Sequence, residues 1–585
     1  MKIKLLLIFF LLLSCDKFDK DTSVLFNNIL EDYYQESLSL YKINATYQGD
    51  NRYNDTLPNF LSSKFEKKEK QFYTSYLNKI NEFKNSSLSD EDLLSKKILI
   101  WDCEIKLKGM EFPKKLIPVD QMWGFQLSFG QLASSKSAQP FKTVQDYRNW
   151  LIRIDGYLEW LESAQNNMVE GIKIGWVLPK SLIKKVLPQL KVMTLPNIDN
   201  HLFYSPVKAF PDSFSQKEKK ELEIEYRDMV LNKIIPAYKK IYDFMSNEYM
   251  DSARTTSGYS ALNGGLEYYK HAIKYYTTTN LTADEIHLLG IQEVERIGNE
   301  MKKIKENVGF DGTLKEFFEY VRTLEELMPF NNPQQVIDNF NSIHDKMLPQ
   351  VNKLFELQPK TKFEVRRTES FREASASAEY NPGSLDGTRP GIFYVPIPNV
   401  EKYNFFSDED LFLHEAIPGH HFQISLQQEN NSLPSFRKNL WYSSYGEGWA
   451  LYSESLGKEL GLYDNQFQYF GMLGAEMHRA IRLVVDTGLH AKGWSREKAI
   501  KYSLENEAES EASIISEIER YMANPGQALS YKIGQLKIQE LRKKAEVAFG
   551  DKFDIRVFHR KILESGSMPL QLLEDKIDKW IDLNE

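Results

Sequence analysis

Residues 413–423 read LHEAIPGHHFQ, and the interpretation of the whole chain starts from this stretch. It holds three of the ten histidines of the chain, at positions 414, 420 and 421, and Glu415 directly follows the first. The preceding SDEDLFL offers Ser407 as a helix N-cap and acidic side chains in the first turn, which favour a helix start. We therefore expect His414 and Glu415 to lie on a helix.

The spacing of the histidines is unusual for a metal site. In the pattern H-E-x-x-H, two imidazoles four residues apart face the same side of a helix and bind one zinc ion. Here the fourth position holds Pro418, and in an unbroken helix His420 points away from His414 while His421 lies ~10 Å along the axis. Proline disrupts a helix interior, and the glycine after it tolerates unusual dihedral angles. We expect a bulge at 417–419 that puts His420 in the ligand position. The alternative ligand is His421; if His420 is the ligand, we expect His421 to support the site from behind or to contact substrate.

The next predicted helix supplies a third ligand. It contains YGEGWALYSE at 445–454, in which Glu447 and Glu454 are seven residues apart and share one face. Glu447 follows His420 by 27 residues (447 − 420), as the third ligand does in glutamate-type zinc peptidases. The glycines and the tryptophan around Glu447 indicate close packing. We expect His414, His420 and Glu447 to bind one Zn²⁺ per chain, with Glu454 supporting a ligand from behind.

Other side chains are predicted to serve the same site. Tyr531, after the loop PGQALS, is expected to donate to the oxyanion, unless it is a packed aromatic. Arg482, Asp486 and His490 are spaced by four on one helix face. We expect Asp486 to orient a metal-binding histidine and Arg482 to bind a substrate carboxylate, unless the two form an internal ion pair. His490 is expected either to bind a substrate carboxylate or to take part in catalysis. Tyr380 is expected at a strand edge that binds an extended peptide, unless the segment is a plain hairpin.

Most of the 585 residues show helical periodicity, for example after the capping box of Thr282 and Glu285. Alternating residues with Pro/Gly turns at about 361–400 predict a few strands. We expect a mainly α fold with two helical lobes around a deep channel: a front lobe at 24–360 and a catalytic lobe at 361–585, with a small β-sheet beside the metal site. The net charge is −8, with no basic patch that predicts nucleic-acid binding.

The N-terminus resembles a lipoprotein leader. Residues 1–14 contain two lysines and then an apolar run at 5–13 that is too short to span a membrane. LLSC at 12–15 resembles a lipobox, so Cys15 is the predicted lipidation site and residues 15–23 a tether; the alternative is an ordinary secretory signal. Lipidation anchors a protein without spanning the bilayer. We expect a cell-envelope protein, periplasmic or surface-exposed, that touches the membrane through its lipid alone.

Several long motifs resemble one family. HEAIPGHHFQ, YGEGWALYSE, IRLVVDTGLHAKGWSREKAI and PGQALSYKIGQLKI look like the bacterial "domain of unknown function 885" family, as do residues 268–297 and 379–396. That family is grouped with zinc metallopeptidases, and its helical fold is similar to thimet oligopeptidase and carboxypeptidase Taq. The resemblance implies an often lipidated, zinc peptidase-like protein. It maps the metal motif onto His414, Glu415 and His420 and the following glutamate onto Glu447.

The expected activity is zinc-dependent hydrolysis of peptide bonds in short peptides. Glu415 is predicted to take a proton from the attacking water and pass it to the leaving amine. Two alternatives stay open: a lipid-anchored protein that binds peptides or glycans without cleaving them, and a zinc hydrolase of a non-peptide amide or ester.

Overall fold

The computed structural model describes residues 20–369, 373, 376–384 and 389–584, and these fold mainly into helices. The predicted mainly α fold is therefore confirmed. No helix in these ranges is long and apolar enough to cross a bilayer. Cys15 and the rest of the N-terminal leader lie outside the described residues.

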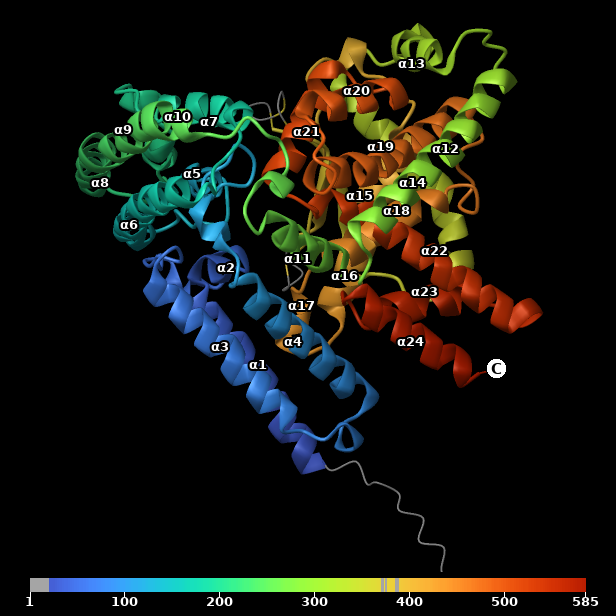
Figure 1. The fold of residues 1–585 in the computed structure, drawn as a ribbon, viewed down its shortest axis with the longest axis horizontal. Helices are drawn as coiled ribbons and strands as arrows, with labels where there is room; N and C mark the ends of the chain where they lie inside the picture. The colour runs from blue at the N-terminus through green and yellow to red at the C-terminus, as the bar shows by residue number, and fades with distance from the viewer. Residues whose placement is uncertain (1–19, 370–372, 374–375, 385–388, 585) are drawn as a thin grey trace, which may run out of the picture.

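Residues 20–252 form a helical arm and a helical layer beside it (Figure 1). Aromatic packing holds the arm together, since the rings of Tyr33 and Phe72 stack with centroids 5.2 Å apart. The arm comprises α1 (Lys20–Leu40), α2 (Lys42–Tyr47), α3 (Ser63–Asn81) and α4 (Asp90–Gly109). The layer comprises α5 (Phe125–Ala133), α6 (Val144–Ile174), α7 (Lys180–Val192), α8 (Gln216–Met229), α9 (Ile235–Phe244) and α10 (Met250–Ser252).

The remaining helices form a larger body, shown at the right of Figure 1. Its first members precede residue 360 in the chain but pack against helices that follow it: α11 (Gly265–Thr277), α12 (Ala283–Asn307), α13 (Leu314–Thr323) and α14 (Pro333–Leu354). The capping box predicted at Thr282 is confirmed at the start of α12. Helix α12 lies directly on α19 (Gln466–His490), because a Cβ at Gly290 would stand 2.7 Å from the Leu483 side chain. The body also contains α20 (Arg496–Asn506), α21 (Glu511–Ala523), α23 (Ile555–Leu563) and α24 (Leu570–Asp582), besides the helices of the candidate site.

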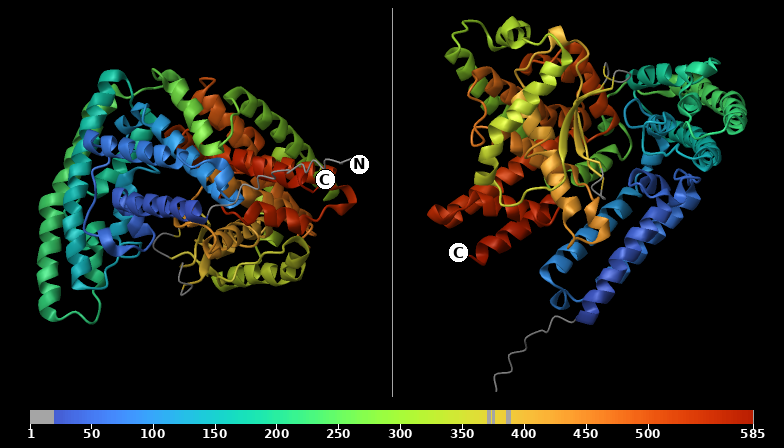
Figure 2. Two further views of the ribbon diagram at one scale, coloured as in Figure 1. Left: turned by 90° about the horizontal axis from the view of Figure 1, so that it is seen from below. Right: turned by 180° about the vertical axis from the view of Figure 1, so that it is seen from behind.

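A three-stranded sheet lies beside the golden helices of the body, as predicted (Figure 2). Its strands are β1 (Phe363–Arg367), β2 (Glu379–Asn381) and β3 (Gly391–Val395), in the order β1-β3-β2. β3 runs parallel to β1 and antiparallel to β2. The central strand is buried because its apolar residues pack on helices; the ring of Phe393, for example, stands edge-on to a phenylalanine of α14, 5.1 Å away.

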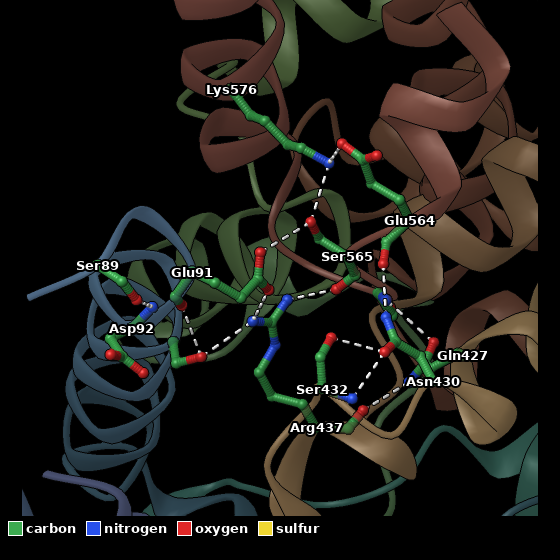
Figure 3. Close-up of polar contacts among 12 residues, drawn as sticks. Ser89, Glu91, Asp92, Gln427, Asn430, Ser432, Arg437, Glu564, Ser565 and Lys576 are labelled. Carbon is green, nitrogen blue, oxygen red and sulfur yellow. Dashed lines mark hydrogen bonds and ion pairs between the residues drawn. The ribbon is translucent and has the colours of Figure 1, made fainter. Parts of the chain in front are cut away.

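One buried arginine ties the arm to the body (Figure 3). Arg437, on the short α17 (Ser435–Lys438), is 1% exposed. Its guanidinium donates to Glu91 at 2.6 Å and Ser95 at 2.9 Å, both on α4, and to the backbone carbonyl of Ser565 after α23. Burying a guanidinium costs free energy that paired donors offset, and both terminal nitrogens of Arg437 are paired. These contacts therefore tie the arm to the C-terminal helices.

Candidate metal centre

The stretch that holds the three histidines folds as two helices. α15 (Asp408–Glu415) ends at Glu415, and α16 (His420–Glu429) begins at His420. Ser407 precedes α15 but makes no side-chain capping bond. The expected bulge is therefore a full interruption over residues 416–419, which brings the ring centroids of His414 and His420 to 4.8 Å, at 89° to one another.

Gly419 makes this interruption sterically feasible. A Cβ at this position would lie 1.9 Å from the carbonyl oxygen of His414 and 2.3 Å from that of Leu413. Any larger residue would push the start of α16 away from the end of α15. The turn is also fixed from outside, because the indole of Trp449 donates to the carbonyl of Pro418 at 2.8 Å.

Glu447 completes the cluster from α18 (Ser443–Ser455). Its Oε2 lies 3.4 Å from Nε2 of His420 and 3.6 Å from Nε2 of His414. Bonds of about 2.1 Å in a tetrahedral zinc site place ligand atoms about 3.4 Å apart, so both distances from Glu447 match one ion. All three ligand atoms lie within 4.8 Å of one another. Glycine again permits the placement, because a Cβ at Gly448 would lie 2.4 Å from Cα of Gly534 on α22 (Ser530–Phe549).

A second carboxylate sets the orientation of the first ligand. Nδ1 of His414 donates to Glu454 Oε1 at 2.7 Å, and Glu454 is 1% exposed. Burial disfavours a charged imidazole, but Glu447 and Glu454 outweigh it and raise the pKa of His414 to about 10. The two histidines likewise outweigh the burial of Glu447 and hold its pKa well below its usual range. Glu447 thus stays an anion. The hydrogen bond from Nδ1 to Glu454 leaves Nε2 of His414 directed at Glu447, 3.6 Å away.

Glu415 lies in the same buried environment. It is 9% exposed, and burial raises its pKa, while His414 and His420 act in the opposite direction. The charges of both histidines and of Glu447 all act on this carboxylate. It therefore has the surroundings that a general base beside a metal ion requires.

Tyr531 is the second residue of α22. Burial raises its pKa, and the next largest contribution is the negative charge of Glu447, so the phenol lies within the field of the metal cluster. The guanidinium of Arg482 sits 4.6 Å from the centroid of its ring. Arg482 itself is used internally, donating to Tyr521 at 3.0 Å and Glu517 at 3.0 Å. The ion-pair alternative, rather than substrate binding, describes its contacts.

Two predicted site residues lie elsewhere, which corrects their expected roles. Asp486 accepts hydrogen bonds from Tyr269 at 2.6 Å and from the backbone N–H of Gly526. Within the described part of the chain, no histidine ring is among its hydrogen-bond partners. His490 accepts from the backbone N–H of Tyr259 and donates to the carbonyl of Tyr521 at 3.0 Å, and burial lowers its pKa to about 3. A spacing of four shows that residues share a helix face but not which neighbour that face meets.

His421 points away from the metal cluster and toward the sheet. Its Nδ1 lies 2.9 Å from the hydroxyl of Tyr380 on β2, and its ring centroid lies 5.0 Å from that of Phe363 on β1. His421 is 2% exposed, and burial lowers its pKa to about 4. The structure therefore groups His420, not His421, with the metal cluster, while Tyr380 and His421 bind each other.

Sequence reasoning did not single out Asp410 or Trp441. Asp410, one turn before His414, is 4% exposed, and burial followed by the charge of Glu454 raises its pKa. It lines a cavity of about 180 Å³ behind the site together with His414, Glu454 and Arg479. The four-residue spacing from His414 was the available signal. Trp441 packs its ring 5.8 Å from that of His420 and is 43% exposed, a position that depends on the tertiary fold.

Solved structures share this fold. The chain is similar to "the putative lipoprotein from Colwellia psychrerythraea", with a TM-score of 0.89 and 27% identity over 96% of this chain and 100% of that one. It is also similar to "a putative lipoprotein of unknown function from Shewanella oneidensis", with a TM-score of 0.72 and 19% identity over 94% and 99% of the two chains. No curated protein matches the sequence. The family model described as "Bacterial protein of unknown function (DUF885)" matches residues 43–577, and the chain therefore belongs to the DUF885 family.

Proposed function

We propose that this protein is a zinc-dependent metallopeptidase that hydrolyses short peptides in the cell envelope. The observation that carries the proposal is the convergence of His414, His420 and Glu447 within 4.8 Å, with Glu415 buried beside them. Two imidazoles and one carboxylate are the protein ligands of several catalytic zinc sites, which keep a fourth position open. A zinc ion bound there would polarise the substrate carbonyl and acidify a water molecule.

The proton chemistry falls to residues of this chain. Glu415 accepts a proton from water as the water oxygen bonds to the carbonyl carbon. It then donates that proton to the amine nitrogen as the C–N bond breaks. Its raised pKa makes it a stronger base than a solvated glutamate. The hydroxyl of Tyr531 donates to the carbonyl oxygen as negative charge develops on it.

The proposed location rests on the leader and on the relatives. The sequence LLSC at 12–15 resembles a lipobox, and both solved relatives are described as putative lipoproteins. We propose that Cys15 is lipidated and that the folded part is anchored to a bacterial membrane, periplasmic or surface-exposed, by this lipid alone.

The decisive experiment compares the mature protein with Glu415→Gln. Both are purified with zinc, the bound metal is counted, and each is incubated with a library of short peptides. We expect one zinc per chain in both proteins, hydrolysis by the wild type, and at least a 100-fold loss of hydrolysis in the variant. Glu401→Gln, at an exposed glutamate, controls for loss of charge.

Each other outcome indicates a different function for this protein. Stoichiometric zinc with equal hydrolysis by wild type and Glu415→Gln removes Glu415 from the mechanism and contradicts the proposal. Peptide binding without cleavage, in a zinc-free protein, indicates the peptide- or glycan-binding alternative. Cleavage of amide or ester substrates but of no peptide indicates a different zinc hydrolase.

A further inference from the structure

A cavity of about 280 Å³ lies between the N-terminal arm and α11. Its walls come from α3, α4, the 3₁₀ turn Pro113–Leu116 and α11. Side chains that line it include Phe60, Glu69, Lys106, Lys114, His271 and Tyr275. It falls just below the roughly 300–1,000 Å³ of typical small-molecule pockets, so it suits one end of a peptide rather than a whole one.

The three lysines that line this cavity differ in their partners. Lys106 pairs with Asp102 at 2.8 Å, and Lys115 pairs with Glu66. Lys114 has no carboxylate within ion-pair distance among the described residues; its ammonium lies 5.9 Å from the ring centroids of two tyrosines. Its positive charge is thus contacted by tyrosine rings but not neutralised by an acid.

A chain of aromatic residues lies between this cavity and the metal centre. The ring of Tyr442 is 5.1 Å from that of Trp101, which lines a neighbouring cavity that shares Ile105, Phe112 and His271 with this one. Trp441, the neighbour of Tyr442 in sequence, packs against the ring of His420 with 5.8 Å between centroids. Trp101, Tyr442 and Trp441 thus lead from the cavity region to the ring of His420.

Lys114 lies beside the helix that contacts the loop before Tyr531. Its ammonium is 5.9 Å from the ring of Tyr268 on α11, and Tyr276 of the same helix donates at 2.9 Å to Asn524 in that loop. Arg482, which lies 4.6 Å from the ring of Tyr531, is already neutralised, because it shares Glu517 with Arg520. Arg254, which contacts the ring of Tyr259 as Lys114 does, donates to backbone carbonyls. Of the lysines that line the cavity, Lys114 is therefore the one without a carboxylate partner among the described residues.

We propose that Lys114 binds a carboxylate of the peptide substrate and gives the enzyme a preference for peptides that carry one at this end. This inference rests on the proposed peptidase function. The carboxylate belongs either to the free C-terminus or to an acidic side chain, which share the same chemistry toward an ammonium group. Glu66 and Glu69 in the same walls are occupied by Lys115 and by the hydroxyl of Tyr41.

The test uses peptides of one sequence, with a free or amidated C-terminus and with Glu or Gln near that end. They are hydrolysed by the zinc-loaded wild type, Lys114→Met, Lys114→Arg and the matched control Lys115→Met. We expect the wild type to prefer one carboxylate source by about tenfold in kcat/KM, mainly through KM. Lys114→Met loses the preference, whereas Lys114→Arg and Lys115→Met keep it.

A separate binding measurement distinguishes failure of this inference from failure of the peptidase proposal. Calorimetry compares the free-acid and amidated peptides on Glu415→Gln, with and without Lys114→Met. Carboxylate-dependent binding that Lys114→Met abolishes supports the inference even if no peptide is cleaved. Equal kinetics for wild type and Lys114→Met on every peptide, or the same loss in Lys115→Met, would overturn it while leaving peptidase activity intact.

Discussion

The sharpest test of the metal centre is Glu454→Gln. In the wild type, Nδ1 of His414 donates to Oε1 of Glu454 at 2.7 Å, and both side chains are buried. Oε2 of Glu454 has no hydrogen-bond partner among the described residues, so the amide NH₂ of glutamine can take that position. The hydrogen bond to His414 survives, and only the negative charge behind the ligand is removed.

The expected effect follows from this geometry. Loss of an outer carboxylate typically reduces metal affinity 10- to 100-fold, and retention of the hydrogen bond places this variant near the lower end. We therefore expect zinc affinity to fall about tenfold, equivalent to about 1.4 kcal/mol. The remaining charge of Glu447 still binds the ion, so zinc stoichiometry stays at one.

The assay is a competition titration against a chromophoric chelator at neutral pH. Glu459→Gln is the matched control. Glu459 comes four residues after the end of α18, the helix that carries Glu454, and pairs at the surface with Arg542 at 2.9 Å. Its zinc affinity is expected to equal that of the wild type. If Glu454→Gln binds zinc as tightly as the wild type, or if the control loses as much affinity, Glu454 does not support the ligand as described.

Three further predictions concern the turn, the arm and buried histidine. Gly419→Ala forces a methyl group against the carbonyl of His414, so we expect zinc binding to weaken at least tenfold while the circular-dichroism spectrum stays helical; unchanged affinity would show that the turn adapts. Glu91→Gln weakens the ion pair that fixes the arm and should lower the free energy of unfolding by about 1–3 kcal/mol in urea titrations. Asp90→Asn, at an exposed pair on the same helix, should lower it by less than about 1 kcal/mol, and equal losses would contradict the role of the buried arginine. The pKa of His490 is lowered to about 3, so between about pH 6.5 and 3 the unfolded chain binds a proton that the folded chain does not, and stability falls as pH falls. Urea titrations across this range should show a slope of up to about 1.4 kcal/mol per pH unit from this residue, and the same slope in His490→Gln would refute the assignment.

The helices and the residues that form the candidate metal site were predictable from the sequence, because the causes of their structure are local. A capping box fixed the start of α12, and proline and glycine forced an interruption between His414 and His420. The flanking glycines of Glu447 indicated close packing, and Gly448 indeed meets Gly534. In each case the relevant contacts lie within a few residues, or the residue type admits few conformations.

The roles of Asp486, His490 and His421 were not predictable in the same way. All three lie on helices as expected, but each is bonded to a partner far away in the sequence, respectively on α11, on α21 and on β2. Periodicity gives the face of a helix and says nothing of what packs against it.

The sequence by itself determined a mainly α chain with a histidine-glutamate motif broken by Pro418 and Gly419, because steric and capping preferences act over a few residues. Only the tertiary structure decided that His420 joins Glu447 while its neighbour His421 turns to the sheet. Adjacent residues on a helix point about 100° apart, so which one meets α18 depends on how the separate helices pack together.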